Sequence, residues 1–470
     1  MRFGRRLLAA ALFLLMLMMT VSHADVPFLV HSDGWDWDNT PVEVWLHADV
    51  DTHMPFDNDR LAMLTPITDA LSLRIVAGQD EGLAAIVMEG DELLTLQQMG
   101  TMVQLSCLPE VTYTAPEDTV SMLLGADVSI GGGYELLGLP KEGESLITDG
   151  RALLAKLPTA MEGYAKRSKN QLSISGYGRS EYMVDYIFTI KQAEDFKRIL
   201  LANCPEGWLH DIISELTFTG KQTVRMYFTA DDVMLRMEYN GGCGPEGDLR
   251  TVKLVYKMRR DEAMDKDYIE LTSPARKGTN KNTLTFERTL QTNAKGERVL
   301  NGSFKYSATK NTVVSVTNGE FTLKNAWNDA SDLITGSVSI QRKLNGAEKY
   351  SSIILAPTLT LSGTQDAPNI VGNLEITEQY AGKTTEHAVV RIDLKKAAPL
   401  QWTERPQAVD LSMMDENALS VLQQQVASQV ATALIRPLIL RFGKDAQWFF
   451  RDLPEEAVQA IIDAAAPAAN

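Results

Sequence analysis

The segment Thr283–Leu394 alternates between apolar and polar side chains, and this period of two constrains the fold more than any other feature of the chain. Within Leu333–Leu344, for example, Ile334, Val338 and Ile340 share one parity, while threonine, serine, glutamine and lysine take the other. Successive side chains of a β-strand point to opposite faces, so the pattern predicts half-buried strands. The polar parity indicates a sheet with one face in water, as antiparallel sheets allow.

Turn signals separate these strands. Asn345-Gly346 tolerates the positive φ of a tight hairpin turn, and the chain then returns through a second alternating run, Tyr350–Leu361. Ala381-Gly382 closes a second hairpin in the same way. The segment therefore predicts an antiparallel β-meander, which is a scaffold or a binding surface before it is an active site.

Helical patterns are fewer. Leu146–Ala165 and Gln192–Ala202 place apolar residues at helical spacing. Val42–Thr52, in contrast, has the alternation of an amphipathic strand. Near the end of the chain, Asp415–Arg441 and Glu455–Asp463 read as amphipathic helices. The predicted fold class is α+β, mainly antiparallel β, with long β-meander sheets curled around or packed on a few helices and with C-terminal helices docked on the sheet.

The length of 470 residues, at about 150 residues per domain, predicts two or three folded units. The changes of pattern along the chain place the predicted segments as follows: a signal peptide at 1–24, an acidic linker at 25–41, a strand–helix–hairpin unit at 42–140, a second α+β unit at 141–282, the antiparallel β-meander at 283–400, and a C-terminal helical segment at 401–470.

The first residues have the pattern of an export signal. Arg2, Arg5 and Arg6 precede the apolar run Leu7–Met19, and small residues lead to an expected cut after Ala24. The paired arginines lack the rest of a twin-arginine pattern, so we expect the general secretory route. No later stretch approaches the roughly 18 uninterrupted apolar residues of a membrane span. We therefore expect no transmembrane segment after signal removal, and a location in the periplasm, the cell wall or the extracellular medium.

The charge balance limits the partners. The chain has 61 acidic and 45 basic residues, for a formal net charge of −16. Proteins gain affinity for nucleic acid by neutralising phosphates, so a chain this acidic is not expected to bind nucleic acid or an anionic membrane surface. The partner stays unknown, with an apolar ligand or another protein as the possibilities.

The three cysteines, Cys107, Cys204 and Cys243, cannot all be paired within one chain. Cys204 and Cys243 both stand beside proline or glycine and are the candidate disulfide in an exported protein. Such a bond would close a loop of about 40 residues and contribute roughly 4 kcal/mol in the chain-entropy model. The alternative is three reduced thiols, because a chain of this size does not need cross-links to be stable.

One strand face has the residue types of a metal site. His47, Asp49, Asp51 and His53 share the polar parity of Val42–Thr52 and its continuation. Alternate strand residues are about 6.6 Å apart, so two neighbours could share one ion but all four could not. A third ligand would have to come from another element. The alternative is a solvated strand face.

Sequence patterns of catalysis are mostly missing. The chain has no His-Glu-x-x-His, Cys-x-x-Cys, Gly-x-Ser-x-Gly or Walker motif. Ser307 and Lys310 match a Ser-x-x-Lys pattern, but they stand between two predicted strands, where the serine cannot open a helix. No catalytic residue and no cofactor is predicted.

These observations favour an exported, non-enzymatic binding or interaction protein that holds an apolar ligand in a concave β-sheet. The order of helices and long strands resembles, in architecture alone, the curled half-barrels of exported lipid or lipoprotein carriers, and no residue is carried over from them. Two alternatives stay open. One is an extracellular or periplasmic hydrolase that uses paired carboxylates, and the other is a structural cell-surface module.

Overall fold

The computed structural model describes a defined part of the chain, and all structural statements below refer to it. The described residues are 28, 41–52, 70–78, 81–107, 111–124, 146–206, 208–244, 249–261, 264–274, 281–310, 313–344, 351–364, 366–401, 408–412, 414, 418, 419, 422, 423, 426, 429, 433 and 437. The expected signal peptide, His53 and the expected helix 455–463 lie outside them.

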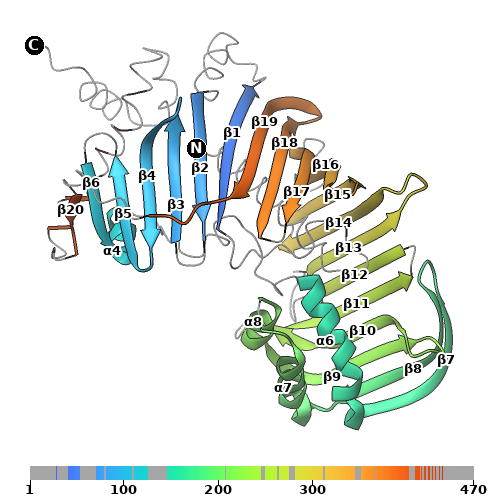
Figure 1. Ribbon diagram of the computed structural model, residues 1–470. Coiled ribbons are helices and arrows are strands. Elements are labelled where there is room, and N and C mark those ends of the chain that lie inside the picture. Colours follow the sequence, from blue (N-terminus) through green and yellow to red (C-terminus); the bar gives the residue numbers. More distant parts are fainter. Residues whose placement is uncertain are drawn as a thin grey trace, which may run out of the picture.

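The strands of the described residues form a single 20-stranded sheet (Figure 1). From β13 to β19 each strand pairs antiparallel with the next one along the chain. The strands of the meander are β13 (Lys281–Thr292), β14 (Arg298–Lys310), β15 (Val313–Trp327), β16 (Ser331–Leu344), β17 (Ser351–Thr364), β18 (Ala367–Tyr380) and β19 (Lys383–Lys396).

The same sheet continues beyond both ends of the meander. On one side β13 pairs with β12, and the order continues to the edge strand β7. These strands are β12 (Met264–Pro274), β11 (Arg250–Asp261), β10 (Met234–Gly244), β9 (Thr217–Phe228), β8 (Gly178–Phe188) and β7 (Ala165–Ile174).

On the other side, β1 (Val42–Thr52) lies between β19 and β2 (Leu71–Ala77). Val44 of β1 stands opposite Leu394 of β19 and Ile75 of β2, so the apolar parity of three strands coincides. The remaining strands are β3 (Glu81–Met88), β4 (Asp91–Met99), β5 (Met102–Cys107), β6 (Val111–Pro116) and β20 (Ala408–Asp410), of which β20 pairs parallel to β6.

The predicted α+β class is therefore wrong. The strands of four predicted segments join one continuous sheet, because neighbouring hairpins pair at their edges instead of forming separate sheets packed on helices. The helices of the described residues are short or local: α4 (Glu117–Leu124), α6 (Leu146–Ala160), α7 (Ala193–Asn203), α8 (Trp208–Glu215) and the 3-10 turns η1 (Glu162–Tyr164) and η2 (Ile190–Gln192).

Helices α6, α7 and α8 gather at one end of the sheet (Figure 1). Their apolar sides, including Leu157, Phe196 and Ile213, pack with Phe218 and Met226 of β9. A capping box at Thr189–Gln192 opens the turn that leads into α7. These helices cover strands at that end of the sheet, with α6 reaching as far as β12, and most of the sheet has no described helix over it.

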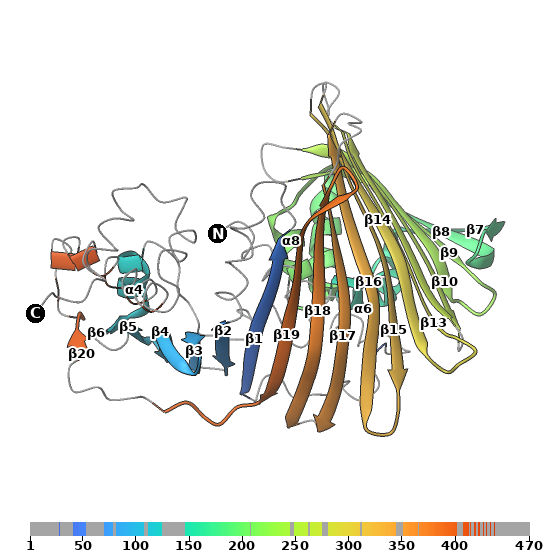
Figure 2. The same ribbon diagram turned by 90° about the horizontal axis from the view of Figure 1, so that it is seen from above.

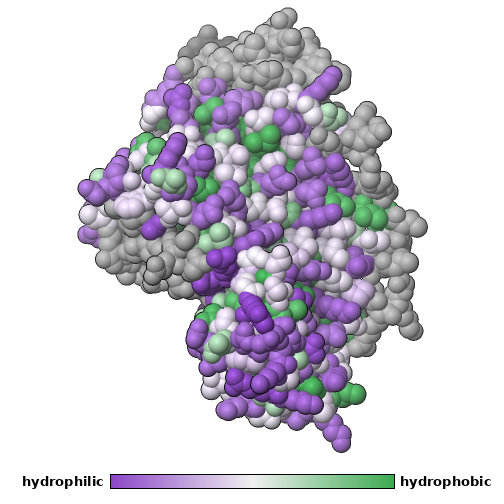
Figure 3. Space-filling view, turned by 90° about the vertical axis from the view of Figure 1, so that its right-hand side faces the viewer, coloured by the Kyte–Doolittle hydropathy of each residue, from purple (hydrophilic) through white to green (hydrophobic). Residues whose placement is uncertain are grey.

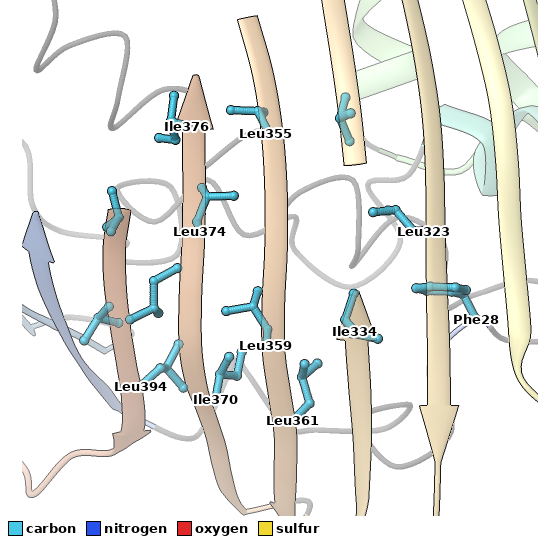
Figure 4. Close-up of a cluster of buried hydrophobic side chains, with 14 of the residues drawn as sticks. Phe28, Leu323, Ile334, Leu355, Leu359, Leu361, Ile370, Leu374, Ile376 and Leu394 are labelled. Carbon is cyan, nitrogen blue, oxygen red and sulfur yellow. The ribbon is translucent and has the colours of Figure 1, made fainter. Parts of the chain in front are cut away.

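The centre of the sheet has a continuous apolar face. Residues of alternate parity on β13–β19, β1 and β2 form one buried cluster, which we call the aliphatic face. Its labelled members in Figure 4 are Phe28, Leu323, Ile334, Leu355, Leu359, Leu361, Ile370, Leu374, Ile376 and Leu394. Burial of each such side chain contributes about 1.5–3 kcal/mol to folding.

The sheet is twisted and bent rather than flat (Figure 2). Gly336 and Gly372 have φ values of 142° and 156°, a region that side chains rarely adopt. A Cβ at Gly336 would lie 2.0 Å from the carbonyl oxygen of Thr322, and one at Gly372 would lie 2.1 Å from that of Thr358. Glycine therefore allows β16 to lie close to β15 and β18 to lie close to β17 at these positions.

The chain after β19 crosses to the other end of the sheet. The Gln97 side-chain amide donates a hydrogen bond to the Gln401 carbonyl oxygen at 2.9 Å. Leu419 and Val426 then pack onto Val103 and Leu105 of β5. No helix among the described residues is both long enough and apolar enough to cross a membrane.

Candidate functional site

A group of charged side chains in contact with one another lies over β11–β13, beneath α6. Five charged residues meet there: Arg151 from α6, Arg260 from β11, Asp265 and Asp267 from β12, and Arg288 from β13. We call this group the arginine–aspartate cluster. The side chains of Asp267 and Arg288 are only 1% and 3% exposed. Charged groups buried this deeply are costly unless they are paired.

The strand register explains why these groups meet. Asp265 and Asp267 are two residues apart on β12, so they point to the same face. Asp265 stands opposite Arg260, and Asp267 stands opposite Arg288. Residues directly opposite one another on neighbouring strands share a face and contact each other. Arg151 then reaches down from α6 onto both carboxylates.

Asp267 is the best-connected member. It accepts hydrogen bonds from Arg288 Nε and Arg151 Nη2, each at 2.7 Å. Arg260 Nη2 lies 3.4 Å from the other carboxylate oxygen, which also accepts a hydrogen bond from the Tyr256 hydroxyl. Four donors from two strands and a helix thus converge on one carboxylate, and charge-assisted hydrogen bonds of this kind are the strong ones.

Asp265 is held by the same three arginines. Arg288 Nη2 donates to it at 3.0 Å and Arg151 Nη2 at 3.1 Å, and Arg260 Nη1 donates to its other oxygen. Arg151 therefore bridges the two carboxylates. This bridge attaches α6 to β12 through charge rather than through apolar packing alone.

The electrostatics favour an ionised Asp267. Burial opposes its ionisation, but the guanidinium groups of Arg288 and Arg151 outweigh that effect and hold the pKa of Asp267 below its ordinary value. The pKa of Arg151 is raised, because the attraction of Asp267 and Asp265 outweighs its own burial. Burial, and after it Asp267, raises the pKa of Tyr256, which stays a hydrogen-bond donor.

The cluster carries more positive than negative charge. Three guanidinium groups face two carboxyl groups, and the Nε of Arg151 is buried without a hydrogen-bond partner. Arginine has five donor N–H groups and cannot lose its charge. The arrangement leaves donor capacity and positive charge that its own carboxylates do not use.

The cluster borders the aliphatic face. Arg288 shares its side of β13 with Phe286 and Leu290, which both belong to or pack on that face. The rings of Phe286 and Phe321 lie 6.4 Å apart. Gly302 is opposite both Arg288 and Phe321. Charge and apolar surface therefore meet on one side of the sheet.

The predicted metal ligands are only partly described. His47 is opposite Ser72 of β2, and its Nδ1 lies 3.3 Å from the Ser72 hydroxyl. His53 lies outside the described residues. Among the residues that are described, no group of three or more histidine, cysteine or acidic side chains is placed to hold a metal ion. A metal site on this strand and its alternative, a solvated strand face, both stay predictions.

The two aspartates of that strand have different neighbours. Asp49 is opposite Val389, whereas Asp51 is opposite His387 of β19. His387 Nε2 in turn lies 2.9 Å from a carboxylate oxygen of Glu375. This acidic partner follows from the pairing of β18 with β19 and from no local spacing in the sequence.

Cys204 and Cys243 lie in the same apolar cluster beneath α7, and both are buried. Burial raises the pKa of the Cys243 thiol, against the opposing effect of its hydrogen bond with Tyr239. Cys107 ends β5 and belongs to the other end of the sheet. The disulfide between Cys204 and Cys243 stays a prediction.

Reasoning from the sequence missed the arginine–aspartate cluster. The available signal was parity: Asp265 and Asp267 share the parity of Ile269, and Arg288 stands between Phe286 and Leu290. A charged residue on the apolar parity of a strand is buried and must find a partner.

Comparisons with known proteins give little guidance. No family model and no curated protein matches the sequence. Among solved structures, the chain has a weak likeness to OmpT from the outer membrane of Vibrio cholerae, with 7% identity over 76% of this chain and 95% of that one and a TM-score of 0.28. A BenF-like porin from Pseudomonas fluorescens Pf-5 has 8% identity over 76% and 98%, with a TM-score of 0.26. Likeness at this level carries no role over to this chain.

Proposed function

We propose that the chain is an exported, non-enzymatic binding protein that takes an elongated apolar ligand on the aliphatic face of its sheet. The observation that carries the proposal is the extent of that face, a single apolar cluster drawn from β13–β19, β1 and β2. Ligand sites are mostly apolar with a few placed polar groups. The export signal in the sequence supports a location in the cell envelope or outside the cell.

The aliphatic face runs continuously across strands. Val44, Leu394, Ile370 and Leu361 are opposite one another in turn on β1, β19, β18 and β17. Directly opposite side chains are about 4.5–5.5 Å apart, so such a row forms an unbroken apolar strip. A ligand that matches this strip is long and apolar rather than compact and polar.

Phe28 illustrates how the face holds an apolar group. Its side chain is fully buried in the aliphatic face, near Leu323 in Figure 4. Its carbonyl oxygen accepts a hydrogen bond from the Asn325 side chain at 2.8 Å, and Asn325 also donates to Asp332 at 2.6 Å. The aliphatic face is therefore packed with an aromatic side chain of the chain itself. By contrast, the surface seen in Figure 3 is mostly hydrophilic.

The hydrolase alternative has weaker support. A carboxylate that acts as a general acid needs a raised pKa, and one that acts as a base or nucleophile needs access to the substrate. Asp267 has a lowered pKa and is enclosed by arginines. Buried carboxylates saturated in this way are placed for structure or charge balance rather than for proton transfer.

Binding can be tested with the exported protein. We expect native mass spectrometry to find a co-purified apolar species, and the neutral dye Nile red to bind saturably and to be displaced by dodecanol. The matched variants are Ile370→Thr and Val371→Thr on β18, whose wild-type side chains are 1% and 47% exposed. Ile370→Thr should weaken Nile red binding several-fold, and Val371→Thr should leave it unchanged. Neither a bound species nor saturable dye binding in the wild type would refute the proposal.

A further inference from the structure

A strip of apolar side chains on β12–β14 lies between the helix-covered end of the sheet and the aliphatic face. We call it the seam, and its members are Ile269, Leu271, Leu284, Phe286, Phe304 and Tyr306. On each strand the two members are two residues apart, so they point to the same side of the sheet. Leu271 is opposite Leu284, and Leu284 is opposite Tyr306. Directly opposite side chains contact each other, so the seam is one apolar surface across three strands.

The seam is more exposed than the clusters on either side of it. Tyr306 is 40% exposed, whereas Leu300 on the same side of β14 is 1% exposed. The other five members of the seam are half-buried. Ile269 packs against the cluster beneath α6 and Phe286 against the aliphatic face, and the remaining members belong to neither. Apolar side chains that a fold leaves open in one contiguous strip mark an interaction surface.

Helix α6 shows how an element lies on this side of the sheet. Its Leu153 and Leu157, one turn apart, pack into the neighbouring cluster, and its Arg151 reaches Asp267 on β12. The helix crosses the strands at that end of the sheet (Figure 1). β12, β13 and β14 each have a paired strand on both sides, so they offer no free backbone edge to an added strand. An element on the seam therefore contacts side chains, as α6 does beside it.

The dimensions of the seam fit a helix. Neighbouring strands are about 4.8 Å apart, so the distance from β11 to β14 is about 14 Å. Three turns of an α-helix are about 16 Å long, and residues at i, i+4 and i+7 lie on one side of them. A helix that crosses the strands can therefore place about one apolar residue over each strand.

The charges beside the seam favour an acidic partner. On this side of β11–β14, the acidic side chains among the described residues are Asp265 and Asp267, and arginines already pair with both. Asp267 is two residues from Ile269, so the arginine–aspartate cluster borders the seam. Its outer arginines, Arg151 and Arg260, are 16% and 17% exposed. A partner from solution can reach them, and complementary charge favours a partner with a carboxylate.

We propose that the seam is the docking surface for an amphipathic helix of a second polypeptide, and that this helix has an acidic residue beside its apolar stripe, facing Arg260. The apolar stripe covers the seam as α6 covers the neighbouring strands. The carboxylate meets the surplus positive charge of the cluster. This inference is independent of the proposed function, because it uses the half-exposed seam and not the buried aliphatic face.

The test uses three fluorescein-labelled peptides of about 18 residues in an alanine-rich background. All three have leucine at i, i+3, i+4 and i+7, and the positions beside this stripe are glutamate, glutamine or lysine. Fluorescence anisotropy measures their binding to the full exported chain. We expect the glutamate peptide to bind about tenfold more tightly than the glutamine peptide, as one charge-assisted contact provides. The lysine peptide should be the weakest, and concentrated salt should bring the glutamate and glutamine peptides together.

Variants separate the apolar contact from the charged one. Leu284→Ser with Tyr306→Ser should weaken binding of the glutamate and glutamine peptides about tenfold, because both contact the seam. Arg260→Gln should remove the preference for glutamate and leave the affinity of the glutamine peptide unchanged. The matched control is Tyr380→Ser at the end of β18, where the tyrosine is 53% exposed and lies outside the seam. It should bind all three peptides as the wild type does.

A second measurement does not depend on any variant of the protein. A glutamate peptide with benzophenone in the middle of its leucine stripe is cross-linked to the wild-type chain by light, and mass spectrometry locates the link. We expect the cross-links on β12–β14. Cross-links confined to other strands would overturn the assignment to the seam.

The remaining outcomes also decide the proposal. If none of the peptides binds saturably, the seam is not a surface for helices. If the glutamate and glutamine peptides bind equally at low salt, the acidic partner is wrong. Vesicles of phosphatidylglycerol test the competing occupant: if the chain sediments with them and the Leu284→Ser, Tyr306→Ser variant does not, the seam faces a lipid surface instead of a helix. The Nile red experiment decides the proposed function separately.

Discussion

Replacement of Asp267 by asparagine tests the charge arrangement of the cluster directly. The wild-type carboxylate accepts hydrogen bonds from Arg288 and Arg151 at 2.7 Å, and also from Tyr256. Asparagine keeps the shape but loses the charge, and its amide N–H groups point at other donors. Three guanidinium groups would then face one carboxylate, Asp265. Breaking a buried ion pair by removing one partner costs about 3–5 kcal/mol, and we expect a loss in that range.

Urea unfolding followed by circular dichroism and tryptophan fluorescence measures this loss. The control is Asp195→Asn on α7, which removes one surface contact with Arg198 and should cost less than about 1 kcal/mol. Hydrogen exchange gives a local readout, since loss of the Asp267 contacts should speed exchange in α6. A loss for Asp267→Asn no larger than that of the control would refute the description of a buried, fully paired carboxylate.

The pH dependence provides an independent check. The pKa of Asp267 in the folded chain is below its ordinary value of 3.8, because the attraction of Arg288 and Arg151 outweighs burial. Its contribution to stability is therefore fully present above that ordinary value and is lost as the pH falls through the folded pKa. The stability gap between wild type and Asp267→Asn should be constant near neutral pH and should narrow only in acid. A gap that narrows between pH 8 and pH 6 would contradict this assignment.

Further predictions concern other parts of the sheet. Gly336→Ala should lower the free energy of unfolding by more than about 1 kcal/mol, because its Cβ would clash with backbone. Gly150→Ala in α6, where a Cβ meets nothing within 4 Å, should raise the free energy of unfolding by about 0.5–1 kcal/mol. Thermal melts compare the two variants. The buried thiol of Cys243 has a raised pKa and should react with a thiol reagent only after unfolding, and non-reducing mass spectrometry would reveal a disulfide instead. Replacing His47 and His53 together by glutamine should change the free energy of unfolding by no more than about 0.5 kcal/mol. A chelator should not shift the wild-type melting temperature. If a chelator lowers the melting temperature of the wild type but not that of the double variant, the strand holds a metal ion.

The sequence by itself determined the strands of the meander and their faces. The alternation predicted over Leu333–Leu344 lies within β16, and the alternation predicted over Tyr350–Leu361 overlaps β17. Ile334 and Val338 belong to the aliphatic face, and Ile340 packs against it. This succeeded because parity along a strand and turn chemistry are local properties, encoded by residues that are adjacent in the chain.

Only the tertiary structure decided how the strands combine. The residues of β1 are separated from β19 by more than three hundred positions, yet Val44 stands opposite Leu394. The parity of a residue along its strand indicates which face of the sheet its side chain occupies, but it does not indicate which strand lies beside it. The sequence pattern therefore predicted separate α+β units where the structure has one sheet.

The arginine–aspartate cluster depended on tertiary structure in the same way. Arg151 and Asp267 are 116 residues apart in the chain, and no local spacing relates a helix residue to a strand residue that far away. The sequence did place Asp267 and Arg288 on the apolar parity of their strands. Their partners were decided by the register of β12 with β13 and by the position of α6, because the cost of burying a charge is met by whichever opposite charge the fold brings into contact.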